Sequence, residues 1–181
     1  GDMAADLIAS LTTLIPDELG RMELVLVERN QGMRELQRQR LAGVRDLPIR
    51  WCSLEELQAA PVRGVVLAHE LLDALPVDRL TWQEGSLQLQ GVALSTRGTL
   101  ESVLLPLQPD LLQQMAEISS RAGVDLPPCG SPEGWTSEWH SDQFSWLQSM
   151  RAGLRQGLLL VIDYAMEARR YYSSGRIDGT L

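Results

Sequence analysis

The sequence predicts an α/β fold with a doubly wound, mostly parallel sheet and an antiparallel insertion. Short apolar runs rich in β-branched residues alternate with helical segments, which is the pattern of parallel strands joined by crossover helices. Three of these runs end in an acidic residue, at Glu28, Glu70 and Asp163. One region instead alternates apolar and polar residues, as antiparallel strands do. The length of 181 residues suits one domain with a single core.

The first elements follow from apolar spacing and stop signals. Residues 3–14 place apolar side chains at helical spacing before Pro16, which predicts a helix that ends there. Residues 23–27 form an apolar run typical of a strand buried on both faces, and this strand ends at Glu28. The polar segment 31–41 then predicts a surface helix.

The next elements repeat this alternation. Residues 48–51 predict a brief strand, and Ser53 with Glu56 three residues later predicts a capped helical turn. Residues 64–68 predict a second buried strand, which leads into Glu70.

The insertion is predicted over residues 79–134. Residues 79–107 alternate around two glycine-containing turns, which indicates antiparallel strands. A helix over 109–121 and a long loop over 123–134 complete it. After the insertion, an amphipathic helix over 142–154 leads into a strand that begins at Gly157 and ends at Asp163.

Composition excludes several classes of function. The formal charge is −8, and all 16 basic residues are arginine. Without lysine, the chain can form neither a Schiff base nor the lysine–phosphate contact of a P-loop. An acidic surface argues against nucleic acid as the main partner and suits a basic partner instead.

Cys52 and Cys129 stand far apart, with no further thiol or histidine at metal-ligand spacing, so neither a metal site nor a disulfide framework is predicted. No apolar run approaches the roughly 20 residues of a membrane span. Without a signal sequence, the expected location is the cytoplasm. Because Gly1 replaces an initiator Met and residues 179–181 carry no terminating feature, both ends are expected to be cut.

The acidic strand ends predict a ligand site, because open α/β sheets bind ligands beyond the carboxyl ends of their strands. A carboxylate after the second strand of such a fold can accept hydrogen bonds from both ribose hydroxyls of an adenosine cofactor, which makes Glu28 the candidate. The alternative is that Glu28 merely ends a strand.

Glu70 and Asp73 lie one helical turn apart, so both carboxylates are expected to project into one crevice. Alternatively, they begin a helix, where the helix dipole favours acids. His69 is expected to be a hydrogen-bonded structural residue rather than a base. Asp163 either belongs to the ligand site or caps amide groups of the following loop.

Several motifs, in order, resemble MidA-type methyltransferases, a family that includes mitochondrial complex I assembly factors and bacterial relatives. Residues 68–77, Ala-His-Glu-Leu-Leu-Asp-Ala-Leu-Pro-Val, are similar to the family hallmark of Ala-Asn-Glu, two apolar residues and Asp-Ala-Leu-Pro. Residues 26–28 followed by 33–37 resemble its second strand and helix. Further along the chain, four segments resemble a later motif of the family, in the same order and at similar spacing. They are Ile162-Asp163-Tyr164, Tyr171-Tyr172, Arg176 and Gly179-Thr180-Leu181. His69 and Ala165 depart from the family's Asn and Gly.

The resemblance implies a class I methyltransferase (Rossmann-like) sheet, S-adenosyl-L-methionine as cofactor and a protein arginine as methyl acceptor. It also implies a link to respiratory complex assembly, with a mitochondrial matrix location in eukaryotic homologues. It assigns Glu70 and Asp73 to catalysis and Glu138 and Tyr164 to the substrate. It assigns four residues to the cofactor: Gly1, Glu28, Ser53 and His69.

The family begins its domain with a strand and the loop Glu-x-Gly-x-Gly-x-Gly. Gly1 is either the last glycine of that loop or a cloning remnant. Since the first strand lies at the centre of a class I sheet, the chain is expected to extend upstream, and also past Leu181. Two alternatives are a nicotinamide-dependent oxidoreductase, which also places an acid at the ribose, and a non-catalytic assembly protein on the same fold.

Overall fold

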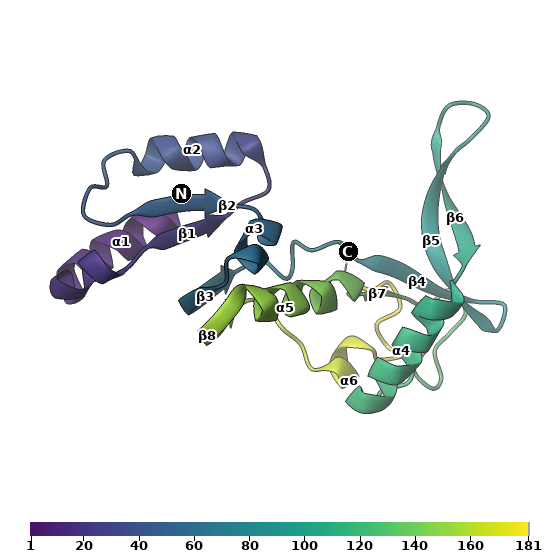
Figure 1. Ribbon diagram of the computed structural model, residues 1–181. Coiled ribbons are helices and arrows are strands. Elements are labelled where there is room, and N and C mark those ends of the chain that lie inside the picture. The colour runs from purple at the N-terminus through teal and green to yellow at the C-terminus, as the bar shows by residue number, and fades with distance from the viewer. Residues whose placement is uncertain (181) are drawn as a thin grey trace. The chain divides into compact units, whose positions relative to one another are not determined.

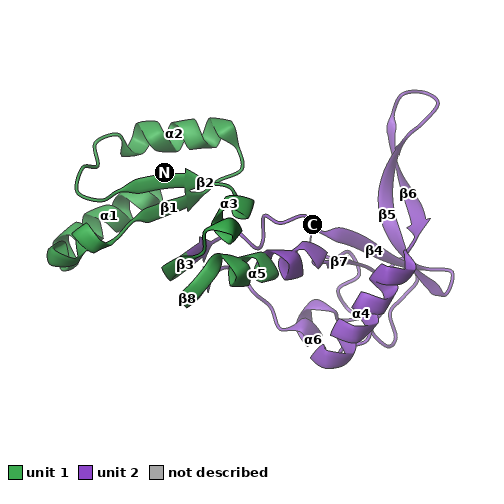
Figure 2. Ribbon diagram, viewed as in Figure 1, with its two compact units in different colours: residues 1–66, 147–159 green, residues 67–146, 160–181 purple. Residues whose placement is uncertain are grey.

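Figure 1 shows the computed structural model of the protein, which describes residues 1–180. Helices alternate with strands that form two two-stranded sheets and one four-stranded sheet. The mixture of parallel and antiparallel pairing confirms the predicted α/β class. The chain divides into two compact units, which Figure 2 shows in different colours.

Unit 1 consists of residues Gly1–Val66 and Leu147–Leu159. Its first elements are α1 (Asp2–Leu14), the 3-10 helix η1 (Pro16–Arg21), β1 (Leu24–Val27), α2 (Gln31–Leu41) and β2 (Ile49–Cys52). β1 and β2 pair in parallel, with Leu24 opposite Ile49. The core of these elements is a cluster of buried apolar side chains: Ala4, Ile8, Leu19, Leu41 and Leu47.

Side-chain caps fix where two helices of unit 1 begin. Asn30 Oδ1 accepts the amide of Met33 at 3.0 Å and starts α2. α3 (Leu54–Ala59) follows Ser53, whose Oγ accepts the Glu56 amide at 3.1 Å while the Glu56 carboxylate accepts the Ser53 amide at 2.7 Å. This reciprocal pair is the capping box that the sequence predicts.

The second sheet pairs β3 (Val62–His69) with β8 (Leu154–Ile162). The strands run parallel, since Gly157 lies against Gly64 and, further along both strands, the Glu70 amide donates to the Ile162 carbonyl at 2.8 Å. Gly157 has a φ of 142°, and a Cβ atom there would overlap the Gly64 backbone. Only glycine permits this approach of the two strands.

Unit 2 consists of residues Leu67–Trp146 and Leu160–Leu181. Its sheet has the order β6-β5-β4-β7 and is built from β4 (Asp78–Gln83), β5 (Ser86–Leu94), β6 (Leu100–Pro106) and β7 (Thr136–Trp139). Its helices are α4 (Pro109–Ala122), α5 (Ser141–Gly153), which continues into unit 1, and α6 (Ala168–Tyr171). Four buried side chains form its core: Leu80, Leu107, Met115 and Trp139.

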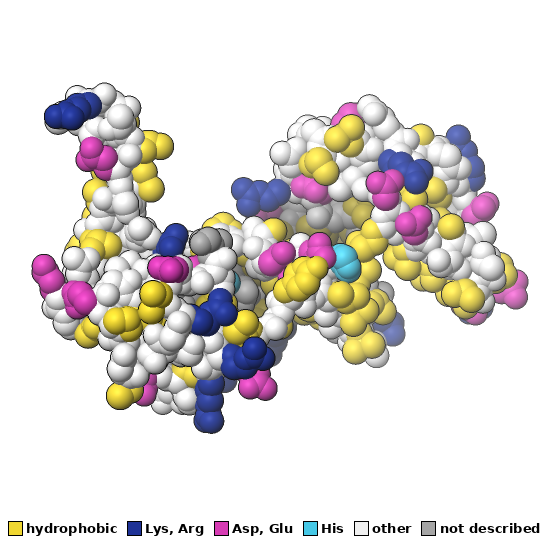
Figure 3. All heavy atoms as spheres, turned by 180° about the vertical axis from the view of Figure 1, so that it is seen from behind, with side chains coloured by type: hydrophobic (Ala, Val, Ile, Leu, Met, Phe, Trp, Pro, Cys, Tyr) yellow, Lys and Arg dark blue, Asp and Glu magenta, His cyan; other side chains and the backbone are white. Residues whose placement is uncertain are grey.

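The β5–β6 hairpin exposes much of its apolar surface. Val92, Leu94 and Leu100 are 71%, 70% and 77% exposed. Val92 and Leu94 share one face of β5, and Leu100 pairs directly with Leu94. Figure 3 shows apolar side chains along this hairpin and, over the rest of the visible face, arginine and acidic side chains interspersed.

Two sequence-based expectations differ from the structure, and two others are not tested by it. The strand before Asp163 begins at Leu154 rather than at Gly157. β7 was not expected, because Thr-Ser-Glu-Trp shows no apolar alternation; it forms by pairing with β4, which places Glu138 opposite Arg79. The described strands lie in three separate sheets, so the doubly wound sheet stays a prediction, as do the insertion boundaries at 79 and 134. No helix within residues 1–180 is long and apolar enough to cross a membrane.

Candidate functional site

The segment between β3 and β4 carries the predicted catalytic carboxylates. Glu70 directly follows β3 and has a φ of 47°, a left-handed conformation that is uncommon for a residue other than glycine. Residues 70–77 form turns and bends rather than a helix. The predicted helical spacing of Glu70 and Asp73 is therefore wrong, and so is the alternative that they begin a helix. Both residues are exposed on this turn.

Asp163 holds this turn in place. Its Oδ2 atom accepts the Leu72 amide at 2.8 Å and the Asp73 amide at 3.3 Å, and its Oδ1 atom accepts the Tyr164 amide at 2.8 Å. Burial raises the pKa of Asp163, but the hydrogen bonds from these amides outweigh burial and hold the pKa below its ordinary value. The expected capping of the following loop is seen only at the Tyr164 amide, whereas the amides of Leu72 and Asp73 belong to the turn after β3.

The side chains flanking this turn are open to solvent. His69 ends β3 in an exposed position. Tyr164, which the resemblance assigns to the substrate, is 83% exposed beside Asp163. Two carboxylates, an imidazole and a phenol are therefore open to solvent on or beside this turn.

Glu138, the other residue assigned to the substrate, is instead buried. It is 1% exposed on β7, and its carboxylate accepts the Thr180 amide at 2.9 Å and the Tyr171 hydroxyl at 2.8 Å. The Thr180 hydroxyl adds a third donor at 2.9 Å. The backbone carbonyl of Glu138 accepts the Tyr172 hydroxyl at 3.2 Å. Glu138 thus fastens the last described residues of the chain, and a contact with substrate stays a prediction.

The groups around Glu138 have shifted pKa values. Burial, opposed by the hydrogen bond to Thr180, raises the pKa of Tyr171 to about 12. Tyr171 therefore stays protonated at neutral pH and can donate to the carboxylate. Its hydroxyl also lies 3.0 Å from Nε2 of His140, whose pKa burial lowers despite the nearby Glu138 charge. The sequence analysis did not single out His140 as part of this hydrogen-bonded group. It did single out Tyr171 and Thr180, as members of the family's later motif.

The chain after α6 is also tied down by its backbone. Thr136 on β7 donates its amide to Ile177 at 2.8 Å, and Arg79 on β4 donates to the Asp178 carbonyl at 3.1 Å. The indole of Trp135, which is fully buried, donates to Ser173 at 3.0 Å. These bonds hold residues 173–178 against β4 and β7.

The predicted cofactor residues lie in unit 1, apart from His69. Glu28 follows β1 and is half-buried, with Oε1 accepting the Asn30 amide at 2.8 Å and Oε2 lying 3.4 Å from the Gln37 amide nitrogen. Gln37 also accepts the indole of Trp51 at 2.9 Å. The Glu28 carboxylate is thus oriented by α2, and each of its oxygens keeps a lone pair for a ribose hydroxyl.

Gly1 and Ser53 each take part in helix starts. Gly1 precedes α1, and a Cβ atom there would approach Arg40. The Ser53 hydroxyl serves the capping box of α3. Their assignment to the cofactor stays a prediction. Within the described part of the chain, no three His, Cys, Asp or Glu side chains gather as metal ligands would.

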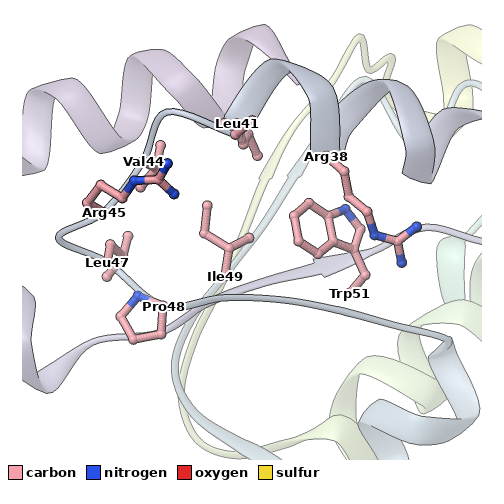
Figure 4. Close-up of a pocket in the computed structure, with 9 residues that line it drawn as sticks. Arg38, Leu41, Val44, Arg45, Leu47, Pro48, Ile49 and Trp51 are labelled. Carbon is pink, nitrogen blue, oxygen red and sulfur yellow. The ribbon is translucent and has the colours of Figure 1, made fainter.

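A shallow cavity of about 460 Å³ lies in unit 1 between α2 and β2. Figure 4 shows its apolar wall, including Leu41 and Ile49, with Arg38 and Arg45 beside it. The Arg38 guanidinium lies 5.2 Å from the centre of the Trp51 ring. None of the residues predicted from the sequence to contact cofactor or substrate lines this cavity.

The chain is similar to a known protein family and to two solved structures. A family model described as "Putative S-adenosyl-L-methionine-dependent methyltransferase" matches residues 1–181. A Burkholderia thailandensis crystal structure, described as a "likely methyl transferase" bound to S-adenosyl-homocysteine, is 27% identical with a TM-score of 0.78 over 99% of this chain and 43% of that chain. An uncharacterized protein of the same superfamily and organism is 27% identical, with a TM-score of 0.68 over 87% of this chain.

The chain spans less than half of these two proteins, 43% of the first and 40% of the second. No curated protein matches the sequence.

Proposed function

Because the chain belongs to the S-adenosyl-L-methionine-dependent methyltransferase family that it matches over residues 1–181, we propose that it forms part of an enzyme that methylates a protein arginine. The observation that carries this proposal is the anchored turn with its exposed carboxylates, Glu70 and Asp73, beyond the end of β3. The relative with S-adenosyl-homocysteine bound supports the choice of cofactor.

The cofactor fits the residues present. When bound, S-adenosylmethionine supplies a methyl group on a sulfonium centre. We assign its ribose to Glu28, because α2 orients this carboxylate and leaves it acceptor capacity for two hydroxyls. The doubly wound sheet of class I methyltransferases remains part of this proposal. Two parallel strand pairs and the TM-score of 0.78 support it.

The acceptor follows from charge. A guanidinium is protonated at physiological pH, and carboxylates bind it through paired, charge-assisted hydrogen bonds. Glu70 and Asp73 have no ion-pair partner among the described residues, so they are available to an external cation. Holding the guanidinium in line with the methyl donor lowers the barrier by proximity. Roles for Glu138 and Tyr164, and a link to complex I assembly, stay proposals that rest on the resemblance alone.

The test is transfer of labelled methyl groups from S-adenosylmethionine to arginine-containing peptides. Replacing Glu70 with Gln removes the negative charge of one carboxylate and keeps the side-chain shape nearly constant. We expect turnover to fall by at least about a hundredfold, as for the loss of a positioned catalytic group, while S-adenosylhomocysteine affinity is retained. Glu101→Gln, an exposed acid on the β5–β6 hairpin, is the matched control.

Unchanged turnover in Glu70→Gln would remove Glu70 from catalysis. No transfer by the unaltered protein, with S-adenosylhomocysteine still bound, would favour the non-catalytic assembly protein. The nicotinamide-dependent oxidoreductase is not favoured, because the family model that matches residues 1–181 describes a methyltransferase.

A further inference from the structure

We propose that Asp163 is the positioning residue of the acceptor site, an anionic anchor that sets the turn at residues 70–73 so that Glu70 and Asp73 face a cationic substrate. This inference rests on the proposed function for the identity of the substrate. It assigns to Asp163 a role that neither the sequence motifs nor the comparisons give it.

The geometry ties the turn to one point at the end of β8. The Glu70 amide donates to Ile162, and the amides of Leu72 and Asp73 both donate to Oδ2 of Asp163. Three of the four amides in the turn are therefore held by two consecutive residues that lie about ninety positions later in the chain. With its backbone fixed at both ends, Glu70 can keep its left-handed φ of 47°.

The anchor has to be a carboxylate. Oδ2 accepts two amides while Oδ1 accepts the Tyr164 amide, so both oxygens act only as acceptors. An asparagine has one oxygen and one NH₂ group, so in either orientation it would place a donor against an amide donor. A donor facing a donor is unfavourable, so the turn would rearrange to pair the part-buried amide of Leu72 elsewhere.

The charge of the anchor is compensated locally. The amides surround the Asp163 carboxylate, and among residues 1–180 no arginine lies within ion-pair distance of it. Within residues 1–180, Glu70 and Asp73 likewise form no ion pair, so no described arginine neutralises them. The site keeps its negative charge for an incoming guanidinium.

The test compares the unaltered protein with Asp163→Asn and Asp163→Ala. Asp110→Asn, an acid in the first turn of α4, is the surface control. Amide hydrogen exchange reports the anchor directly. We expect the amides of Leu72 and Asp73 to lose at least about tenfold of their protection in both Asp163 variants, as for the loss of a hydrogen bond to a charged group.

The functional measurements use the peptide acetyl-Gly-Arg-Gly-amide as probe and S-adenosylhomocysteine as cofactor ligand. We expect peptide affinity and kcat/KM for methyl transfer to fall by at least about tenfold in both Asp163 variants, with cofactor affinity unchanged. If Asp163 had a purely structural role, its variants would bind both peptide and cofactor more weakly and would unfold at a lower thermal midpoint. That result would overturn the proposal.

Two further outcomes would also overturn it: unchanged protection of Leu72 and Asp73, or unchanged peptide affinity after that protection is lost. If the unaltered protein binds the peptide but transfers no methyl group, the proposed function fails while the anchor is still tested by exchange and peptide binding. If the unaltered protein does not bind the peptide at all, the inference fails in its substrate assignment.

Discussion

At the scale of single residues, the acids of this protein divide by their partners. The carboxylate oxygens of Asp163 and Glu138 accept hydrogen bonds from donors of the chain itself, whereas Glu70 and Asp73 are exposed. Glu28 is intermediate, because one backbone amide and one side-chain amide orient it without filling its acceptor capacity. The number of internal donors at each carboxylate therefore separates structural acids from those available to a ligand.

Glu28→Ala tests the cofactor assignment at this scale. The substitution removes the acceptor for two ribose hydroxyls, and we expect S-adenosylhomocysteine affinity in calorimetry to fall by at least about tenfold. Glu35→Ala removes an exposed acid of unit 1, on α2, and should leave the affinity unaltered. Equal affinities for both variants would exclude Glu28 from the ribose site.

At the scale of elements, local patterns predicted most helices and strands, and long-range contacts decided the rest. Some elements depend only on residues that are close together in the sequence, so they could be predicted. They are the apolar strands β1, β3 and β8 and the capping box at Ser53. β7 could not, because its four polar or aromatic residues become a strand only by pairing with β4.

The candidate site follows the same division. The sequence placed Glu70 at the end of a strand correctly, because a strand's end is a local property. It assigned a helix to the following residues, whereas the turn depends on hydrogen bonds to Asp163, which is remote in sequence. The burial of Glu138 likewise depends on Thr180 and Tyr171 and left no local signal.

Gly157→Ala tests the close pairing of β3 and β8. A Cβ atom at this position would overlap the Gly64 backbone, and its φ of 142° is unfavourable for alanine. We expect a loss of more than about 2 kcal/mol in the free energy of unfolding, measured by urea denaturation. Gly43→Ala, where no atom lies within 4 Å of the added Cβ, is the control. Equal stability of the two variants would contradict this packing.

At the scale of the whole molecule, charge decides which partners are suited. The chain has a net charge of −8 and no lysine, and its arginines are interspersed with acids on the face seen in Figure 3. Such a surface attracts a basic partner and disfavours the phosphate backbone of nucleic acids. This fits the proposed arginine-bearing protein substrate.

The charge gives a prediction for the intact protein. Attraction between an acidic surface and a basic peptide is screened by salt, so raising the ionic strength from about 0.05 M to about 0.5 M should weaken binding of an arginine-rich peptide. S-adenosylhomocysteine affinity should change much less over the same range. The measurement is a calorimetric titration at several salt concentrations, and peptide binding that is independent of salt would rule out charge as the basis of recognition.

The tie between Leu72 and Asp163 also bears on how the protein folds. These residues lie 91 positions apart, so closing the loop between them carries a large entropic cost and requires β8 to have been synthesised. The β4–β5 and β5–β6 hairpins contain only local contacts and can form earlier. We therefore expect the turn that carries Glu70 to reach its final shape among the last events of folding, after the hairpins beside it.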